Sequence, residues 1–240
     1  MHINYTNIPV SQRLKILTTA TENQIRKGKR PSIHSFSIDL NNFKDEFVNK
    51  KHTDAQIKRV MLFAERLVGY GYEDFAGVVY SFLLKITNNL KLAEEIALKE
   101  LALAKRTRDP IHICARISDI EKIYKIKAPN SPEHIKWIRE NKKYLNKLVK
   151  HYDYAKKNYR TMIKKARPKE YYEKALANSH LNLAKMISKQ YPKEALNEIK
   201  EAQEILQKLM LDGSCDIAAL ERDLGFADIL SKNIKKNIKR

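Results

Sequence analysis

Few residue combinations in this 240-residue chain have the types and spacing that catalysis or metal binding requires. His112 and Cys114 stand two positions apart, which places them on different sides of a helix, so we expect a packed thiol beside a partly exposed imidazole. Glu94 and Glu95 are expected to be solvated acids on a helix surface. The sequence contains no glycine-rich phosphate loop, no H-E-x-x-H and no C-x-x-C. We therefore predict a chain without enzyme activity, metal or cofactor.

A basic segment is the more informative feature. The chain carries a formal net charge of +19, and Lys and Arg far outnumber the two acids Glu140 and Asp153 between residues 134 and 169. Such a surface attracts polyanions, whether nucleic acid, an anionic membrane surface or an acidic protein. An ordinary solvated face of a Lys-rich chain is the alternative interpretation. The candidate polyanion-binding residues are Arg139, Lys142, Lys147, Lys156, Lys157, Arg160, Lys164 and Lys165.

Aromatic residues are interleaved with these cations. Exposed aromatic rings can stack on unpaired bases, while lysines hold phosphates. The competing interpretation, which we prefer for most of them, is that the rings are half-buried packing residues. The residues concerned are Trp137, Tyr144, Tyr154, Tyr159, Tyr171 and Tyr172.

The elements that position these residues are expected to be helices almost throughout. Gly and Pro are few, whereas Lys, Glu, Leu, Ile and Ala are abundant. We divide the chain into an irregular N-terminal extension or cap at 1–52, a helical array at 53–231 and a basic tail at 232–240. In the extension we expect a helix over 11–27 that ends at Gly28, and an extended stretch over 29–40, where Phe36, Ile38 and Leu40 alternate.

Helix starts and stops are marked clearly in the array. Thr53 and Gln56 form a capping box, and Asp109-Pro110 and Ser131-Pro132 are cap–proline starts. A break is expected near Tyr152-Asp153, followed by helices over 170–189 and 192–211. Asp212-Gly213 ends the latter, and a last helix is expected to reach about Leu230.

A small–bulky–small pattern recurs at helical spacing. It occurs at Ala97, Leu101 and Ala104, more loosely at Ala155, Tyr159 and Met162, and again at Ala195, Ile199 and Ala202. Together with His180, Leu183, Ala184 and Ile187 on a preceding helix, the last copy resembles the tetratricopeptide repeat, and the resemblance is best over residues 140–210. Two helices can cross closely only where side chains are small, which is the physical reason for the alanines.

The resemblance implies an all-α fold of antiparallel helical hairpins, stacked as a right-handed superhelix. The chain departs from the family pattern in two respects: the intervals between copies are unequal, and His180 stands where the family has a bulky aromatic residue. In the family, the first helix of each pair lines a concave groove that holds a peptide. Carried over to this chain, the groove residues are Lys143, Asn146, Lys150, Asn178, Lys185 and Lys189.

These observations predict a non-catalytic protein-interaction module that binds an acidic or extended segment of a partner in a basic helical groove. The alternative is a nucleic-acid-associated helical protein that uses the 134–169 surface and the C-terminal tail. A homodimer through the exposed end of the array is compatible with the sequence. We expect a cytoplasmic protein without integral membrane association. The longest apolar run, residues 75–84, is too short to span a bilayer, and the two cysteines, Cys114 and Cys215, have no paired spacing, which fits a reducing compartment.

Overall fold

The computed structural model describes residues 10–48, 54–158, 167–213 and 216–238, and over these residues the chain forms helices and no strand. The predicted all-α fold is therefore confirmed. The chain divides into two compact units, residues 1–107 and 108–240, whereas the sequence predicted boundaries after residues 52 and 231.

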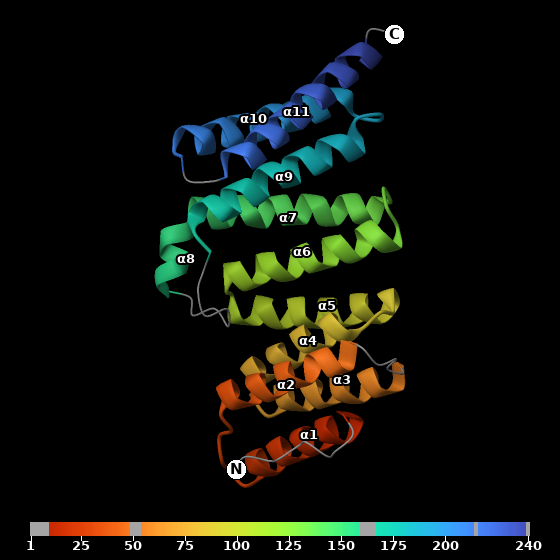
Figure 1. The fold of residues 1–240 in the computed structure, drawn as a ribbon, viewed down its shortest axis with the longest axis vertical. Helices are drawn as coiled ribbons and strands as arrows, with labels where there is room; N and C mark the ends of the chain where they lie inside the picture. The colour runs from red at the N-terminus through yellow and green to blue at the C-terminus, as the bar shows by residue number, and fades with distance from the viewer. Residues whose placement is uncertain (1–9, 49–53, 159–166, 214–215, 239–240) are drawn as a thin grey trace. The chain divides into compact units, whose positions relative to one another are not determined.

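The first unit contains five described helices, and successive helices run antiparallel (Figure 1). They are α1 (Val10–Arg26), α2 (Ile33–Val48), α3 (Asp54–Gly69), α4 (Glu73–Ile86) and α5 (Leu90–Thr107). Ion pairs join α1 to α3 and α3 to α5, while α2 and α4 contact each other. This alternation places α1, α3 and α5 in one layer and α2 with α4 in a second.

α4 lies at the centre of the first unit. It has buried side chains on most of its circumference, among them Phe75, Val79 and Leu83. A helix without a polar face must be surrounded by other elements. α4 packs against α2, α3 and α5, which satisfies that requirement.

The predicted extended stretch over residues 29–40 is wrong, because α2 begins at Ile33. Phe36 and Leu40 are both buried, but Ile38, which lies between them, is 44% exposed. The alternation of apolar residues over five positions also satisfies the i, i+4 spacing of a helix, so periodicity alone did not distinguish the two structures. The expected helix that ends before Gly28 is confirmed by α1, and Gly28 has a positive φ of 69°.

The second unit contains α6 (Pro110–Lys127), α7 (Pro132–Lys150), α8 (Tyr152–Asn158), α9 (Lys169–Ile187), α10 (Pro192–Leu211) and α11 (Ile217–Ile238). Both cap–proline starts are confirmed. Asp109 accepts hydrogen bonds from the backbone N–H groups of Ile111 and His112, and Ser131 accepts one from His134. The break between α7 and α8 falls at His151, as predicted. Thr53 of the predicted capping box lies outside the described residues.

The alanines of the last tetratricopeptide-like copy lie in the contact between α9 and α10. Ala184 on α9 and Ala195 and Ala202 on α10 are fully buried, and Leu183 and Ile199 are each 1% exposed. These residues belong to one apolar cluster that extends to Leu220 on α11. The small side chains allow the two helix backbones to approach closely, which is the role the sequence predicted for them.

Over the residues that the structure describes, the copy that begins at Ala155 does not form the helix pair with α7 that the resemblance implied. α7 packs extensively against α6 and α9, whereas its contact with the seven described residues of α8 is much smaller. Ala155 is buried in α8, but Tyr159 and Met162 lie outside the described residues. In this structure α7 is thus the second helix of a hairpin with α6, not the first helix of a pair with the segment that follows it.

The C-terminal tail is also more regular than predicted. α11 continues to Ile238, past the expected end near Leu230, so the described part of the 232–240 tail is helical. Ile234 is buried on the face that contacts the second unit's core, and the lysines around it are exposed.

The close α9–α10 contact gives a direct stability test. We expect Ala202→Leu to lower the free energy of unfolding by about 1–3 kcal/mol, because extra atoms at a fully buried position force the two helices apart. Ala218→Leu is the matched control, since Ala218 is exposed on α11. Urea denaturation followed by circular dichroism measures both. Equal stability of the two variants would contradict the close contact.

Candidate functional site

Five cations form one stripe along the solvent-facing side of α7. They follow each other at intervals of three, four, four and three residues, which keeps them on one side of a helix. All five are exposed. The members of this α7 stripe are Lys136, Arg139, Lys143, Lys147 and Lys150.

The α7 stripe is held loosely by its neighbours. Arg139 lies 3.1 Å from Glu194 of α10, and Lys143 lies 3.7 Å from Glu140. The side chains of Arg139 and Lys143 remain 49% and 58% exposed. Exposed ion pairs of this kind contribute about 0–1 kcal/mol, so an external anion can compete for these cations.

The stripe combines residues from both predicted sets. Lys143 and Lys150 came from the predicted groove, Arg139 and Lys147 came from the predicted polyanion surface, and Lys136 was missed. Of the other polyanion candidates, Lys157 is exposed on α8 and Lys156 lies in the same helix. Arg160, Lys164 and Lys165 lie outside the described residues.

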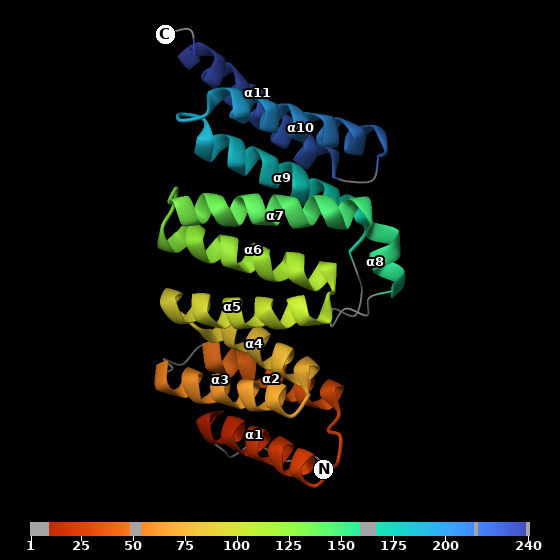
Figure 2. The ribbon, with the colours of Figure 1, turned by 180° about the vertical axis from the view of Figure 1, so that it is seen from behind.

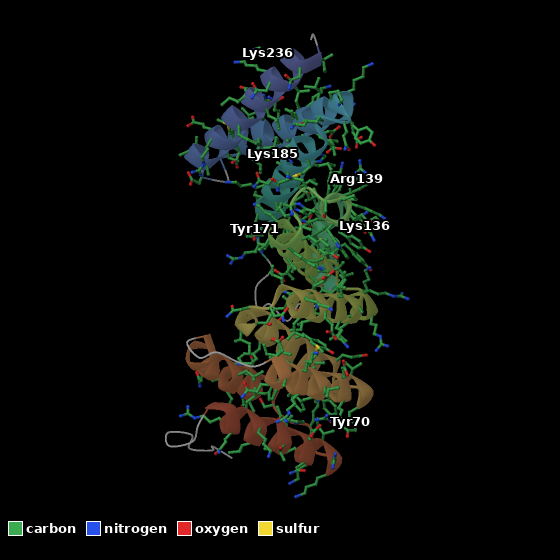
Figure 3. The ribbon with its side chains drawn as sticks, turned by 90° about the vertical axis from the view of Figure 1, so that its right-hand side faces the viewer. Tyr70, Lys136, Arg139, Tyr171, Lys185 and Lys236 are labelled. Atoms are coloured by element: carbon green, nitrogen blue, oxygen red, sulfur yellow. The ribbon has the colours of Figure 1, made fainter. Side chains whose placement is uncertain are left out.

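The six predicted groove residues do not come together. Asn146 lies beside the stripe on α7 with Lys143 and Lys150, but Asn178, Lys185 and Lys189 follow the open side of α9 and its C-terminal end. Figure 3 shows Lys136 and Arg139 on one side of the second unit and Tyr171 and Lys185 of the α9 segment on the other. α7 and α9 belong to different layers of the stack, so their open sides point in opposite directions.

Contacts with α10 establish this layer assignment. Arg139 pairs with Glu194, and Lys142 pairs with Glu198. A step toward the C-terminus of α7 therefore corresponds to a step toward the C-terminus of α10. α7 and α10 are therefore parallel neighbours in one layer. α9 lies in the other layer and contacts both helices through its buried side.

A largely buried polar network connects α7, α9 and α10. Glu198 is its centre: Lys142 Nζ donates to Oε1 at 2.5 Å, and His180 Nδ1 donates to Oε2 at 2.7 Å. The side chains of His180 and Glu198 are 9% and 12% exposed. Lys142 is thus committed to an internal contact, which separates it from the exposed candidates with which the sequence grouped it.

Glu198 is stabilised in its ionised form. Burial alone would raise its pKa, but the hydrogen bonds from His180 and Lys142 and their charges lower the pKa below its ordinary value. A carboxylate accepts hydrogen bonds and cannot donate them, so His180 presents a protonated Nδ1 to it. His180 thereby supplies a polar link at the position where the tetratricopeptide family has a bulky aromatic residue.

A second polar contact, the Asn141 clamp, joins α6 to α7 and consists of Asn141, Glu121 and Ser118. Asn141 donates from Nδ2 to Glu121 at 2.6 Å and accepts from the Ser118 hydroxyl at 3.2 Å. Burial raises the pKa of Glu121, and the hydrogen bond from Asn141 with the nearby Lys125 opposes that effect. The clamp fixes the rotation of α7 about its axis, which determines the side of α7 that faces solvent.

An aromatic pair lies on the same hairpin. The rings of Tyr124 and Trp137 are 6.4 Å apart between centroids and tilted by 32°. Lys127 Nζ lies 5.3 Å from the Tyr124 ring, and Lys136 Nζ lies 5.9 Å from the Trp137 ring. Both aromatic side chains are partly exposed, so they are neither core residues nor fully free platforms.

His112 and Cys114 are packed as the sequence predicted, and Glu95 is exposed, but Glu94 is half-buried. Cys114 is 2% exposed and His112 is half-buried. Burial raises the pKa of the Cys114 thiol to about 12, which makes it a poor nucleophile. Among the described residues, no group of three or more His, Cys, Asp or Glu side chains could hold a metal ion. None of the helices described is both long enough and apolar enough to cross a membrane.

Sequence reasoning missed the Glu198 network, the Tyr124–Trp137 pair and the continuity of the α7 stripe. A signal for the network was present, because acids four residues apart on α10, Glu194 and Glu198, face bases three residues apart on α7, Arg139 and Lys142. Reading that signal requires knowledge that α7 and α10 are parallel neighbours.

Comparison with known proteins gives little further guidance. No family model matches the chain, and no curated protein matches it either. Solved structures that align along most of the chain include the DHF58 filament (13% identity, TM-score 0.33, covering 96% of this chain and 98% of that one) and the DHF119 filament (14%, 0.31, 96% and 99%). Another is the de novo designed helical repeat protein DHR64 (15%, 0.28, 96% and 98%). These TM-scores are too low to support an argument about fold or function.

The ionised Glu198 makes stability depend on pH. Its pKa is lower in the folded than in the unfolded chain, so its contribution is present above the ordinary value of 4.5 and is lost as the pH falls through the lower, folded value. We expect Glu198→Gln to lower the free energy of unfolding by about 1–3 kcal/mol at pH 7, and this difference to shrink toward about pH 3. Urea denaturation across that pH range measures it.

Glu204→Gln is the matched control on the same helix, because the Glu204 side chain is 60% exposed. It should leave stability close to that of the wild type at every pH. A difference between wild type and Glu198→Gln that stays constant from pH 7 to about pH 3 would contradict the proposed ionisation.

Proposed function

We propose that this protein is a non-catalytic interaction module, and that its second unit binds an acidic segment of another protein along the α7 stripe. The observation that carries the proposal is the stripe itself, in which five exposed cations share one side of a single helix. The tetratricopeptide relationship and a cytoplasmic location are parts of the same proposal. The buried alanines between α9 and α10 support the first, and the free, buried Cys114 thiol supports the second.

The spacing of the α7 stripe favours a linear ligand. At about 1.5 Å of rise per residue, neighbouring cations are about 4.5–6 Å apart along the helix and the stripe is about 20 Å long. In an extended peptide, alternate side chains repeat at about 6.6 Å on one side. A segment with an acidic residue at every second position therefore presents carboxylates at a spacing close to that of the cations.

The Glu198 network and the Asn141 clamp support this role indirectly. They fix the orientation of α7 from both sides, so the stripe is presented on a rigid helix and little conformational entropy is lost when a partner binds. Lys side chains supply point charges without demanding a fixed geometry, which suits a carboxylate-rich segment of variable sequence.

Charge reversal along the stripe tests the proposal. We expect the variant Lys136→Glu, Lys143→Glu, Lys147→Glu, Lys150→Glu to bind a fluorescein-labelled peptide of alternating Glu and Ser at least about tenfold more weakly than wild type, because each reversal adds a like-charge contact. Fluorescence anisotropy at about 50 mM salt is the measurement, since exposed charges are screened at higher ionic strength.

The control reverses two lysines, Lys185 and Lys189, which are exposed on the other side of the second unit, and it changes the net charge half as much as the α7 variant does. This variant should bind the peptide within about twofold of wild type, apart from the general loss of positive charge. If it loses as much affinity as the α7 variant, binding follows net charge and the α7 stripe is not the site. If neither variant loses affinity, the proposal fails.

A second candidate function is nucleic-acid binding, which the Tyr124–Trp137 pair with its flanking Lys127 and Lys136 specifically favours. If single-stranded RNA binds here, Trp137→Ala should weaken binding by about 1–3 kcal/mol through loss of stacking, and affinity should fall by orders of magnitude between about 50 and 200 mM salt. The same substitution should leave binding of the acidic peptide nearly unchanged. RNA binding that is insensitive to Trp137→Ala would remove the aromatic pair from the site.

A further inference from the structure

A groove runs between α1 and α3 in the first unit. The two helices lie side by side in both views of the ribbon (Figures 1 and 2). The groove has a volume of about 470 Å³, which falls within the range of about 300–1,000 Å³ that small-molecule sites occupy. It extends from Gln12 and Gln56 at one end to Glu22 and Arg66 at the other.

The floor of the groove is apolar. Leu14 of α1 and Phe63 of α3 are 6% and 1% exposed and belong to the core of the first unit, and the partly buried Val60 packs against that core. A floor anchored in the core keeps its shape when a ligand binds. Apolar ligand atoms that contact this floor are removed from water, which favours binding.

Charge is arranged differently at the two ends. Arg66 Nε lies 2.5 Å from Glu22 Oε1, so an internal ion pair closes one end. Two helical turns earlier on each helix, Lys15 and Arg59 line the groove. Because seven residues separate Lys15 from Glu22 and also Arg59 from Arg66, the two cations occupy the same level across the groove.

Lys15 and Arg59 carry the charge that the groove leaves uncompensated. Both are exposed, and neither takes part in an ion pair within the part of the chain that the structure describes. Glu22 is the acid among the lining residues, and it is already paired with Arg66. The groove therefore combines an apolar floor with a localised positive end.

We propose that the α1–α3 groove binds an organic anion that carries one carboxylate head and an unbranched apolar tail. The head lies between Lys15 and Arg59, where a guanidinium can offer two hydrogen bonds to one carboxylate. The tail follows the floor formed by Leu14, Val60 and Phe63 for about 10 Å, until the Glu22–Arg66 ion pair closes the groove. This site lies in the first unit and is independent of the function proposed for α7.

Octanoate is the probe, because it has the head, a tail of suitable length and high solubility. We expect the full-length protein to bind it with one-to-one stoichiometry and a Kd of about 1 mM or tighter, measured by isothermal titration calorimetry. Backbone amide shifts of Thr18, Thr19 and Gln56 in a ¹H–¹⁵N correlation spectrum should locate it in the groove. Acetate, which lacks the tail, and octan-1-ol, which lacks the charge, should each bind at least about tenfold more weakly.

The double variant Lys15→Gln, Arg59→Gln tests the head. We expect at least about a tenfold loss of octanoate affinity, with an unchanged circular dichroism spectrum because both residues are exposed. Lys58→Gln is the control, because Lys58 is exposed on α3 and is not part of the groove lining. The Lys58→Gln variant should bind octanoate as the wild type does. Thr18→Phe, which places a ring over the floor, tests the tail and should also abolish binding.

Three results would overturn the proposal. The first is absence of octanoate binding to the wild type at about 5 mM. The second is equal affinity for octanoate and octan-1-ol, which would remove the role of Lys15 and Arg59. The third is octanoate binding whose amide shifts fall outside α1 and α3.

Discussion

The close contact between α9 and α10 is the constraint on which the arrangement of the second unit depends. Ala184, Ala195 and Ala202 are small enough to let the two backbones approach closely, which fixes the buried faces of both helices relative to each other. α7 then packs against the side of α9 that remains, and it becomes a parallel neighbour of α10. The apolar faces of α7, α9 and α10 meet in these contacts, and the cations of the α7 stripe lie on the side that points outward.

Polar contacts determine how each helix of the second unit is rotated about its own axis. Apolar contacts are non-directional, so they tolerate small rotations of a helix about its axis. The hydrogen bonds that Glu198 accepts from Lys142 and His180 have defined geometry, and so does the bond between Asn141 and Glu121. Breaking one of them would leave a largely buried polar group unsatisfied, at a cost of about 1–3 kcal/mol. The outward direction of the α7 stripe is therefore specified by residues that are not members of the stripe.

Local sequence signals predicted most of the secondary structure. These signals depend on interactions between residues that are close together in the sequence, so both interacting residues can be read from one short segment. Examples are the caps at Asp109 and Ser131, the break near Tyr152 and the start of α10 at Pro192. The failure over residues 29–40 arose where a short apolar run fits two periodicities. Four of the five cations of the α7 stripe were named as candidates from the sequence, but they were divided between two surfaces, and Lys136 was not named.

The division failed because it depended on which helices form a hairpin. The tetratricopeptide register assigned α7 to the same layer as α9, which would align Lys143 and Lys150 with Lys185 and Lys189. In the structure α6 is the partner of α7, and this shift by one helix moves α7 to the layer of α10. Residues of α7 alone do not encode that choice. It depends on α6, whose residues Ser118 and Glu121 engage Asn141 across the hairpin. In a stack of similar helices, the surface on which a charged side chain appears thus depends on which helices form hairpins with each other. A site on such a protein can be located only after these hairpins are known.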